Sequence, residues 1–243
     1  MTVPFKSKAM VLAAGLGMRM RPLTEHTPKP LIKVAGKALL DHALDWLAAA
    51  GIEQVVVNMH YLAEQIETHL ASRVQPAVTF SYEPVLLETG GGVVQALPLL
   101  GEGAFFVANS DTICVDGATP ALHRLLASWD ESQMDALLLL HPVEKAVGYP
   151  GKGDFFLDKQ TPRRRGQAVS APYVFTGVQL LHPRLFSSAP QGAFSMNILY
   201  DQALAQGRLK ALVHDGDWLH VGDVDGLKQA EDRLLRFMTA RHP

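Results

Sequence analysis

The chain has 243 residues, with 22 lysines and arginines against 24 aspartates and glutamates, and 48% of its residues are hydrophobic. This length and composition exclude a disordered or fibrous protein and are typical of a globular chain that buries its own core. The net charge of −2 excludes a general electrostatic attraction to nucleic acids or anionic membranes. One cysteine, Cys114, excludes an internal disulfide, residues 1–10 lack the apolar segment of a signal peptide, and no apolar run could span a bilayer. We therefore expect a soluble cytoplasmic protein.

Short apolar segments alternate with helical patterns along the first half of the chain. The run over residues 8–14 ends in small residues and glycine, which indicates a buried strand leading into a tight loop, and the prolines that follow exclude a regular helix before Leu39. A helical pattern then extends to Ala50. The next expected strands are 54–57, 78–82 and 105–108, and the expected helices are 61–70 and 92–100. This order predicts βαβ units and a parallel sheet covered by helices on both faces.

The pattern is looser after Asp111. Residues 148–165 are rich in glycine, proline and charge, which indicates a loop and hairpin laid over a ligand crevice. The expected helices here are 122–129, 196–205 and 224–238, and the expected strands are 136–140, 173–181 and 209–213. Because there is no repeat or low-complexity linker, we expect one domain over residues 1–243.

The most informative segment is LAAGLGMRMRPLT at 12–24, followed by TPKPL at 27–31. Glycines directly after a strand allow backbone N–H groups to turn inward and bind phosphate oxygens. Arg19 adds a cation beside this loop, and Lys29 is held between two prolines as a second one. The segment is neither a Walker loop nor a dinucleotide fingerprint, since it lacks the G-K-[ST] of the first and the third glycine of the second. Together these features favour a triphosphate-binding loop over a turn with ordinary surface cations.

This segment resembles the sugar-nucleotidyltransferase family, whose pattern is L-x-A-G-x-G-x-R-[ML]-x-P-x-T followed by P-K-P. The resemblance implies a doubly wound α/β fold with a mixed, mainly parallel, Rossmann-like sheet of the GT-A type. It also implies an enzyme that joins a nucleoside triphosphate to a sugar 1-phosphate with Mg²⁺ and releases pyrophosphate. Residues 1–115 would form the nucleotide-binding half and residues 116–243 the sugar-phosphate half. The nucleotide-binding residues implied in the loop are Leu12, Ala14, Gly15 and Gly17, and the catalytic residues are Arg19 on the β- and γ-phosphates and Lys29 between the α-phosphate and the sugar phosphate.

The segment EPVLLETGGG at 83–92 follows the third expected strand. Three glycines before a helix let a flat base approach the backbone, whose N–H groups can bind its edge. The family reads the base at this position, so Glu83, Glu88, Thr89 and Gly90 are candidate nucleotide-binding residues. The variant L-E-T-G-G-G looks most like short bacterial members that act on N-acetylmuramate 1-phosphate and relatives that act on mannose 1-phosphate. A glycine-rich helix start with only packing duties is the alternative.

Asp111 follows the apolar strand at 105–108, at the sheet edge where open α/β folds bind ligands. The resemblance implies that Asp111 is a Mg²⁺ ligand, although a turn aspartate is the alternative. A second ligand normally comes from W-x-D-V-G-T, but residues 218–223 read WLHVGD. His220 thus stands at the aspartate position and Asp223 at the threonine position. Imidazole suits softer ions than Mg²⁺, so three accounts remain: Asp223 reaches the metal, His220 binds a softer ion or a coordinating water, or the site is weakened. We favour Mg²⁺ on Asp111 with water and phosphate completing its shell and His220 close by; an ordinary packed histidine is the alternative for His220.

On the acceptor side, the resemblance implies sugar contacts from Gly153, Thr176 and Asn197. An asparagine amide both donates and accepts, which suits hydroxyl groups. The alternatives are that Asn197 caps a helix and that Gly153 serves a hairpin. Arginines 163–165 are more typical of a solvated loop, so we leave them out of the site.

The resemblance therefore implies that UTP and N-acetylmuramic acid α-1-phosphate give UDP-N-acetylmuramic acid in a peptidoglycan-recycling route. The alternative substrates are GTP or dTTP, or UTP again, with mannose or glucose 1-phosphate. A non-catalytic nucleotide-sugar sensor, which has lost a metal ligand at His220, is a third hypothesis. The expected partners are the nucleoside triphosphate and the sugar 1-phosphate, and the expected assembly is a monomer or small homo-oligomer.

Overall fold

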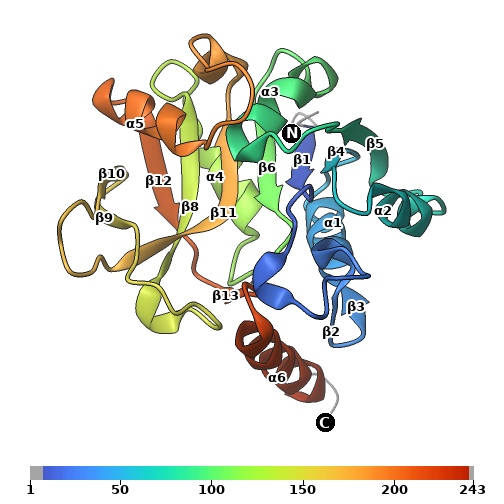
Figure 1. The fold of residues 1–243 in the computed structure, drawn as a ribbon. Coiled ribbons are helices and arrows are strands. Elements are labelled where there is room, and N and C mark those ends of the chain that lie inside the picture. Colours follow the sequence, from blue (N-terminus) through green and yellow to red (C-terminus); the bar gives the residue numbers. More distant parts are fainter. Residues whose placement is uncertain (1–7, 241–243) are drawn as a thin grey trace.

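The computed structural model describes residues 8–240, so the outermost residues of the expected domain, 1–7 and 241–243, lie outside it. Within the described residues a nine-stranded sheet forms the centre of the molecule (Figure 1). Four parallel strands from the first half lie in the order β6-β1-β4-β5. Their bounds are Ala9–Leu12 for β1, Gln54–Met59 for β4, Ala77–Tyr82 for β5 and Phe105–Asn109 for β6. The predicted βαβ units are therefore present.

Strands from the second half continue the same sheet. Strand β11 lies antiparallel between β6 and β8, and β12 lies parallel to β8 at the edge. A hairpin of β9 and β10 joins β11 through the pair Tyr173 and Phe155. The bounds are Ala136–Pro142 for β8, Phe155–Asp158 for β9, Thr161–Arg164 for β10, Tyr173–Leu181 for β11 and Leu209–Val213 for β12. The sheet is thus mixed but mainly parallel, which confirms the predicted α/β fold class.

Helices cover both faces of the sheet because its strands are apolar on both sides. On β1, Ala9 and Val11 belong to the core beneath α1, α2 and α4, whereas Met10 between them belongs to the core beneath α3 and α5. The helices are α1 (Leu39–Ala49), α2 (Ala63–Leu70), α3 (Glu88–Leu100), α4 (Ala121–Ser128), α5 (Asn197–Ala205) and α6 (Val224–Ala240). Helix α6 packs outside these two layers, on a smaller third cluster that includes Ile113 and Leu219 (Figure 1).

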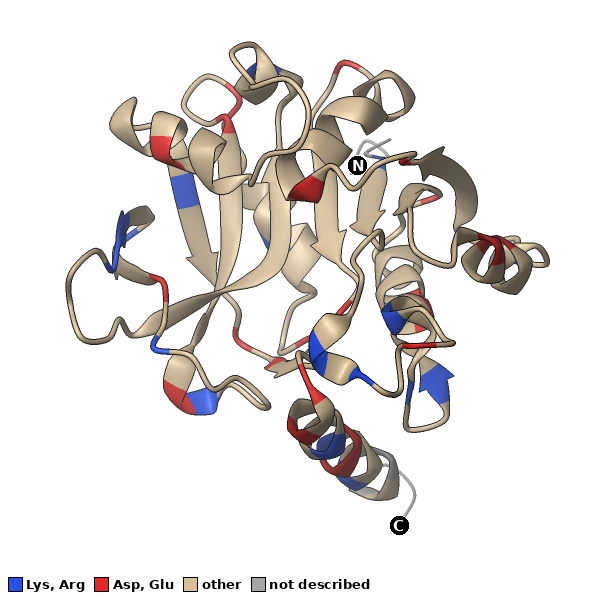
Figure 2. Ribbon diagram, viewed as in Figure 1, with Lys and Arg blue, Asp and Glu red and all other residues tan. Residues whose placement is uncertain are grey.

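Two short sheets were not predicted. Strand β7 (Thr112–Val115) pairs with β13 (Asp217–His220), and β2 (Lys33–Val34) pairs with β3 (Lys37–Ala38). Helix α3 begins at Glu88, four residues before its expected start at Gly92. Acidic and basic residues are distributed over the whole fold and mixed along α6 (Figure 2). In the described part of the chain, no helix combines the length and apolarity needed to cross a membrane.

Candidate active site

A cavity of about 480 Å³ opens at the carboxyl ends of β1, β4 and β6. Parallel strands end at a common edge, so the loops that follow them form one crevice. Of the predicted residues, those that line the cavity are Leu12, Ala14, Gly15, Gly17, Arg19, Lys29, Glu88, Thr89 and Asp111. The lining residues that were not predicted include Asn58, Asn109, Ser110, Ser195 and Gly222. The predicted residues that lie outside the lining are Glu83, Gly90, Gly153, Thr176, Asn197, His220 and Asp223.

The loop after β1 is shaped by Gly17 and Thr24. Gly17 has a φ of 64°, in the left-handed region that glycine adopts without strain. A Cβ on Gly17 would lie 3.0 Å from Cβ of Lys29, so glycine also lets Lys29 pack against the loop. The buried Thr24 donates its hydroxyl to the Gly17 carbonyl at 2.8 Å. The spacing of Gly17, Thr24 and Lys29 therefore has a local cause: it closes the loop and brings Lys29 to it.

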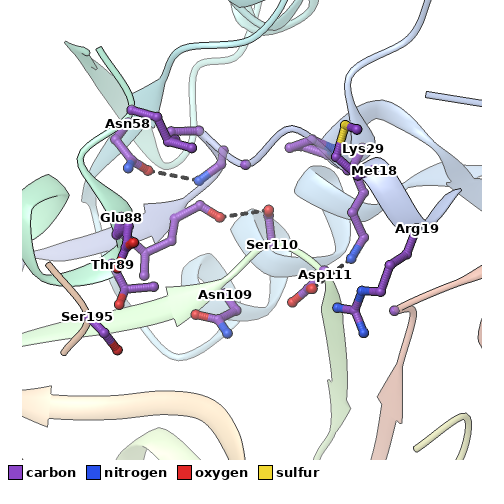
Figure 3. A pocket seen from close by; sticks show the side chains of 18 residues that line it. Met18, Arg19, Lys29, Asn58, Glu88, Thr89, Asn109, Ser110, Asp111 and Ser195 are labelled. Atoms are coloured by element: carbon purple, nitrogen blue, oxygen red, sulfur yellow. Dashed lines mark hydrogen bonds and ion pairs between the residues drawn. The ribbon is translucent and has the colours of Figure 1, made fainter. Parts of the chain in front are cut away.

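The cationic end of the cavity is built on Lys29, Asp111 and Arg19 (Figure 3). Lys29 Nζ donates to Asp111 Oδ2 at 2.7 Å, with 12% of the lysine and 26% of the aspartate side chain exposed. Burial raises the pKa of Asp111, but the charges of Lys29, His220 and Arg19 and the Lys29 hydrogen bond outweigh it, so this pKa lies below its ordinary value. Asp111 is therefore an anion held between cations at neutral pH.

Asn109 and Ser110 directly precede Asp111 and also line the cavity. The Ser110 hydroxyl donates to the Leu12 carbonyl at 2.7 Å, which ties the end of β6 to the end of β1. A Cβ on Gly177 would lie 2.7 Å from Nδ2 of Asn109, so that glycine leaves room for the amide. The signal that could have identified both residues is their position at the strand end, next to an aspartate already singled out.

The opposite wall contains Glu88 and Thr89 at the start of α3 (Figure 3). Glu88 has a φ of 58°, an uncommon conformation for a residue with a side chain. The N–H of Gly90 donates to the Phe194 carbonyl at 2.8 Å, and the Thr89 hydroxyl accepts from the N–H of Met196. This end of α3 is thereby attached to the segment before α5, and the N–H of Gly90 already has a partner within the chain.

The three glycines of α3 each admit a different neighbour. A Cβ on Gly90 would overlap the Phe194 ring, and one on Gly91 would overlap the Gly192 carbonyl. A Cβ on Gly92 would lie 2.7 Å from Oε1 of Glu83. These three glycines are in close contact with other parts of the chain. We attribute the start of the helix at Glu88 to this packing, which offsets the poor helix propensity of glycine.

The C-terminal motif reaches Asp111 through the pairing of β7 with β13. The N–H of Val221 donates to the Asp111 carbonyl at 2.9 Å, and His220 lies opposite Thr112. The His220 ring stacks on Trp218, with Nδ1 3.2 Å from the Gly148 carbonyl oxygen, and Gly222 leaves space for this ring. Both His220 and Gly222 are therefore neighbours of the metal-binding candidate Asp111, although Gly222 alone of the two lines the cavity.

Asp223 occupies a different position, at the start of α6. Its Oδ1 accepts the N–H of Gly226 at 2.8 Å, which is the contact of a helix cap. Among residues 8–240, no group of three or more histidine, cysteine, aspartate or glutamate side chains could hold a metal ion. Asp111 offers Mg²⁺ one carboxylate in the cavity, and Mg²⁺ commonly takes one or two carboxylates with water and phosphate oxygens, so Asp111 is chemically able to hold this ion.

The predicted sugar-binding residues lie outside the cavity lining. The Thr176 side chain is fully buried and its hydroxyl donates to the Leu139 carbonyl at 2.8 Å. Gly153, with a φ of 77°, packs where a Cβ would overlap the Ala171 carbonyl. Asn197 is exposed at the start of α5, and Ser195, two residues earlier, is the residue of this segment that lines the cavity.

These features agree with comparisons to known proteins. The family model described as nucleotidyl transferase matches residues 8–153, so the chain belongs to the nucleotidyl transferase family. The family predicted from residues 12–31 is thereby confirmed.

Individual relatives match the chain over nearly its full length. It is 45% identical to an N-acetylmuramate alpha-1-phosphate uridylyltransferase of Caulobacter vibrioides, over 93% of this chain and 96% of the relative. It is 38% identical to the enzyme of the same name from Neisseria meningitidis, over 92% and 96%. A crystal structure of UDP-glucose pyrophosphorylase complexed with UDP-glucose superposes with a TM-score of 0.77 at 18% identity, over 95% of this chain and 99% of that one, which shows the shared fold.

Proposed function

We propose that the protein is a sugar-1-phosphate nucleotidyltransferase that converts UTP and N-acetylmuramic acid α-1-phosphate into UDP-N-acetylmuramic acid and pyrophosphate. The observation that carries this proposal is the 45% identity to a uridylyltransferase of that specificity across 93% of the chain. The cavity supports it, because its cations and its glutamate-bearing wall lie on opposite sides, as a nucleotide's phosphates and base require (Figure 3).

In this reaction a sugar phosphate oxygen attacks the α-phosphorus of the nucleotide. A new P–O bond forms there, the bond between the α-phosphorus and the bridging oxygen breaks, and pyrophosphate leaves with that electron pair. The attacking oxygen is already an anion, so the site needs no strong base; it needs cations that reduce the repulsion between two phosphates. Arg19 and Lys29 supply them, with Arg19 on the β- and γ-phosphates and Lys29 between the two reacting phosphates.

In this proposal Asp111 also holds the metal ion, next to Lys29. Mg²⁺, held by Asp111 with water and phosphate oxygens, would supply further neutralising charge when bound. Lys29 Nζ, which donates to Asp111 Oδ2 at 2.7 Å, would then be shared between that carboxylate and a phosphate oxygen. His220 stays a candidate for a contact through water, since β13 pairs it with Thr112, the residue after Asp111. Asp223 stays a candidate because it lies two residues after Val221, whose N–H donates to the Asp111 carbonyl.

The remaining roles follow the walls of the cavity. Main-chain groups at Leu12, Ala14, Gly15 and Gly17 would hold the ribose and phosphates, and Glu88 and Thr89 would face the base. On the sugar side we propose Ser195 and Asn197 as direct contacts. Thr176 and Gly153 would support the sugar site from behind, because Thr176 is 0% exposed and Gly153 is buried, and their carbonyls accept from Trp218 Nε1 and Arg165 Nε.

The reactants and the product indicate where in the cell the enzyme acts. A nucleoside triphosphate and a phosphorylated cell-wall sugar are both cytoplasmic metabolites, so we propose that the enzyme acts in the cytoplasm in the recycling of peptidoglycan sugars.

The decisive experiment measures pyrophosphate release for UTP, GTP and dTTP, each with the 1-phosphates of N-acetylmuramic acid, mannose and glucose. We expect the highest kcat/KM for UTP with N-acetylmuramic acid 1-phosphate, and none without added Mg²⁺. A preference for GTP with mannose 1-phosphate would contradict the proposed substrates. Binding of a nucleotide sugar without turnover of any pair would instead identify a sensor.

A further inference from the structure

A buried hydrogen-bonded connection runs from Asn58, which lines the cavity, to Glu83 behind it, and has no part in the chemistry described above. The N–H of Ala13, in the phosphate loop, donates to Asn58 Oδ1 at 2.8 Å (Figure 3). Asn58 Nδ2 donates to Glu83 Oε1 at 2.6 Å, and the N–H of Leu87 donates to Glu83 Oε2 at 3.0 Å. Two side chains therefore connect the backbone of the phosphate loop to the backbone of the loop before α3.

Both ends of this connection adjoin cavity walls. Ala13 lies among the lining residues of the phosphate loop, and Leu87 lies between Leu86 and Glu88, which line the opposite wall. Asn58 is placed by β4, the strand between β1 and β5, so its side chain stands midway between the two loops. The connection therefore spans the space between the two walls.

The connection is enclosed by the protein. Glu83 is 0% exposed and Asn58 is 3% exposed. Gly92 of α3 packs against both side chains, since a Cβ there would lie 2.7 Å from Glu83 Oε1 and 2.9 Å from Asn58 Nδ2. Each carboxylate oxygen of Glu83 already accepts an N–H, and none of the side chain is exposed, so it cannot contact a base in the cavity. Buried groups with this degree of satisfaction fix geometry rather than bind ligands directly.

We propose that Asn58 and Glu83 are positioning residues that hold the phosphate loop and the base loop at the distance one nucleotide requires. Glu83 therefore acts on the nucleotide through Leu87 and through Asn58, and does not read the base. The inference rests on the proposed function only in taking a nucleoside triphosphate as the ligand; it makes no assumption about which base or sugar is used.

The chain offers a polarity exchange as the test. In N58D two carboxylates face each other and repel, and in E83Q the new amide either opposes the N–H of Leu87 or loses the bond to Asn58. In the double variant N58D/E83Q every bond can form again. The new carboxylate accepts from Ala13 and from the new amide, whose oxygen accepts from Leu87. Size and total charge match the wild type.

The measurement is the dissociation constant for UTP and for GTP with Mg²⁺, by calorimetry without sugar phosphate. One of these two nucleotides will be the one that the wild type accepts. For that nucleotide, we expect each single variant to raise the dissociation constant by about tenfold or more. The double variant should recover to within about threefold of the wild type. The matched control is Y200F, which breaks a buried side-chain bond of the same 2.6 Å length, between Tyr200 and Gln179. It should lower the melting temperature without changing the dissociation constant.

Several outcomes would overturn the proposal. Wild-type affinity in both single variants would do so, as would a double variant no better than the single ones. A change in preference between UTP and GTP that E83Q and the double variant share would show that Glu83 reads the base. If the wild type accepts GTP in place of UTP, the proposed substrate is wrong. The comparison of the single and double variants, made with GTP, then still tests the positioning role. A wild type that binds neither nucleotide contradicts both the proposed function and this inference.

Discussion

Lys29 combines a local and a distant constraint. Locally, Pro28 and Pro30 place it in a single 3-10 turn. At a distance of 82 residues along the chain, Asp111 holds its Nζ at 2.7 Å. The side chain is therefore preorganised for the role that we propose for it, which is to meet the charge that builds up on phosphate; preorganised charge of this kind is usually the largest single contribution to catalysis.

The variant K29A removes that charge while sparing the core. We expect kcat to fall by about 10² to 10³ or more, with a melting temperature close to that of the wild type. Initial rates of pyrophosphate release test this, with K33A, at an exposed lysine of β2, as the control that should keep wild-type turnover. Unchanged turnover in K29A would contradict the assignment of Lys29.

The sequence predicted best those cavity residues whose position is marked by a local pattern. Arg19, Lys29 and Asp111 stand beside glycines, prolines or a strand end, and all three line the cavity. Asn58 carries no such signal, since its partners Ala13 and Glu83 are separated from it by 45 and 25 residues. The buried state of Glu83 was equally hidden, because a glutamate followed by proline is typical of a surface turn.

At the scale of elements, packing outweighs the low helix propensity of glycine in α3. Its run of glycines should delay the helix, but Phe194, Gly192 and Glu83 fill the space that their missing side chains leave. The short sheet of β7 and β13 was missed for a related reason. Its four-residue strands have weak patterns of their own, and their pairing depends on contacts between residues about 100 positions apart.

The variant G91A tests this account of α3. An alanine inside a helix gains about 1 kcal/mol over glycine, but here its Cβ would overlap the Gly192 carbonyl, and overpacking costs about 1–3 kcal/mol. We expect a net loss in the free energy of unfolding, measured by urea titration. G103A is the matched control because nothing lies within 4 Å of the Cβ it would add. Stabilisation by G91A would contradict the packing explanation.

At the scale of the whole molecule, one sheet connects the two halves. Strand β6 of the first half pairs with β11 of the second, and β11 pairs with β8, which carries the buried His141. His214 follows β12 beside it, with the ring centroids 5.9 Å apart. Their Nε2 atoms lie 3.2 Å from the carbonyl oxygens of Gly216 and Asp217, to which they donate.

This histidine pair predicts a pH dependence of folding. Burial lowers the pKa of His141 and of His214 from the ordinary value of 6.5. Above that value both are neutral in the folded and unfolded chain. As the pH falls below it, the unfolded chain takes up protons first, so the free energy of unfolding declines until the pH reaches the lower folded-state values. Urea midpoints should therefore be lower at pH 5.5 than at pH 7.5.

The double variant H141Q/H214Q keeps an N–H donor at each position but cannot titrate, so its midpoint should change less over this interval. His42, whose pKa burial also lowers, would retain part of the effect in that variant. Equal pH dependence in the two proteins would show that the histidine pair is not its source.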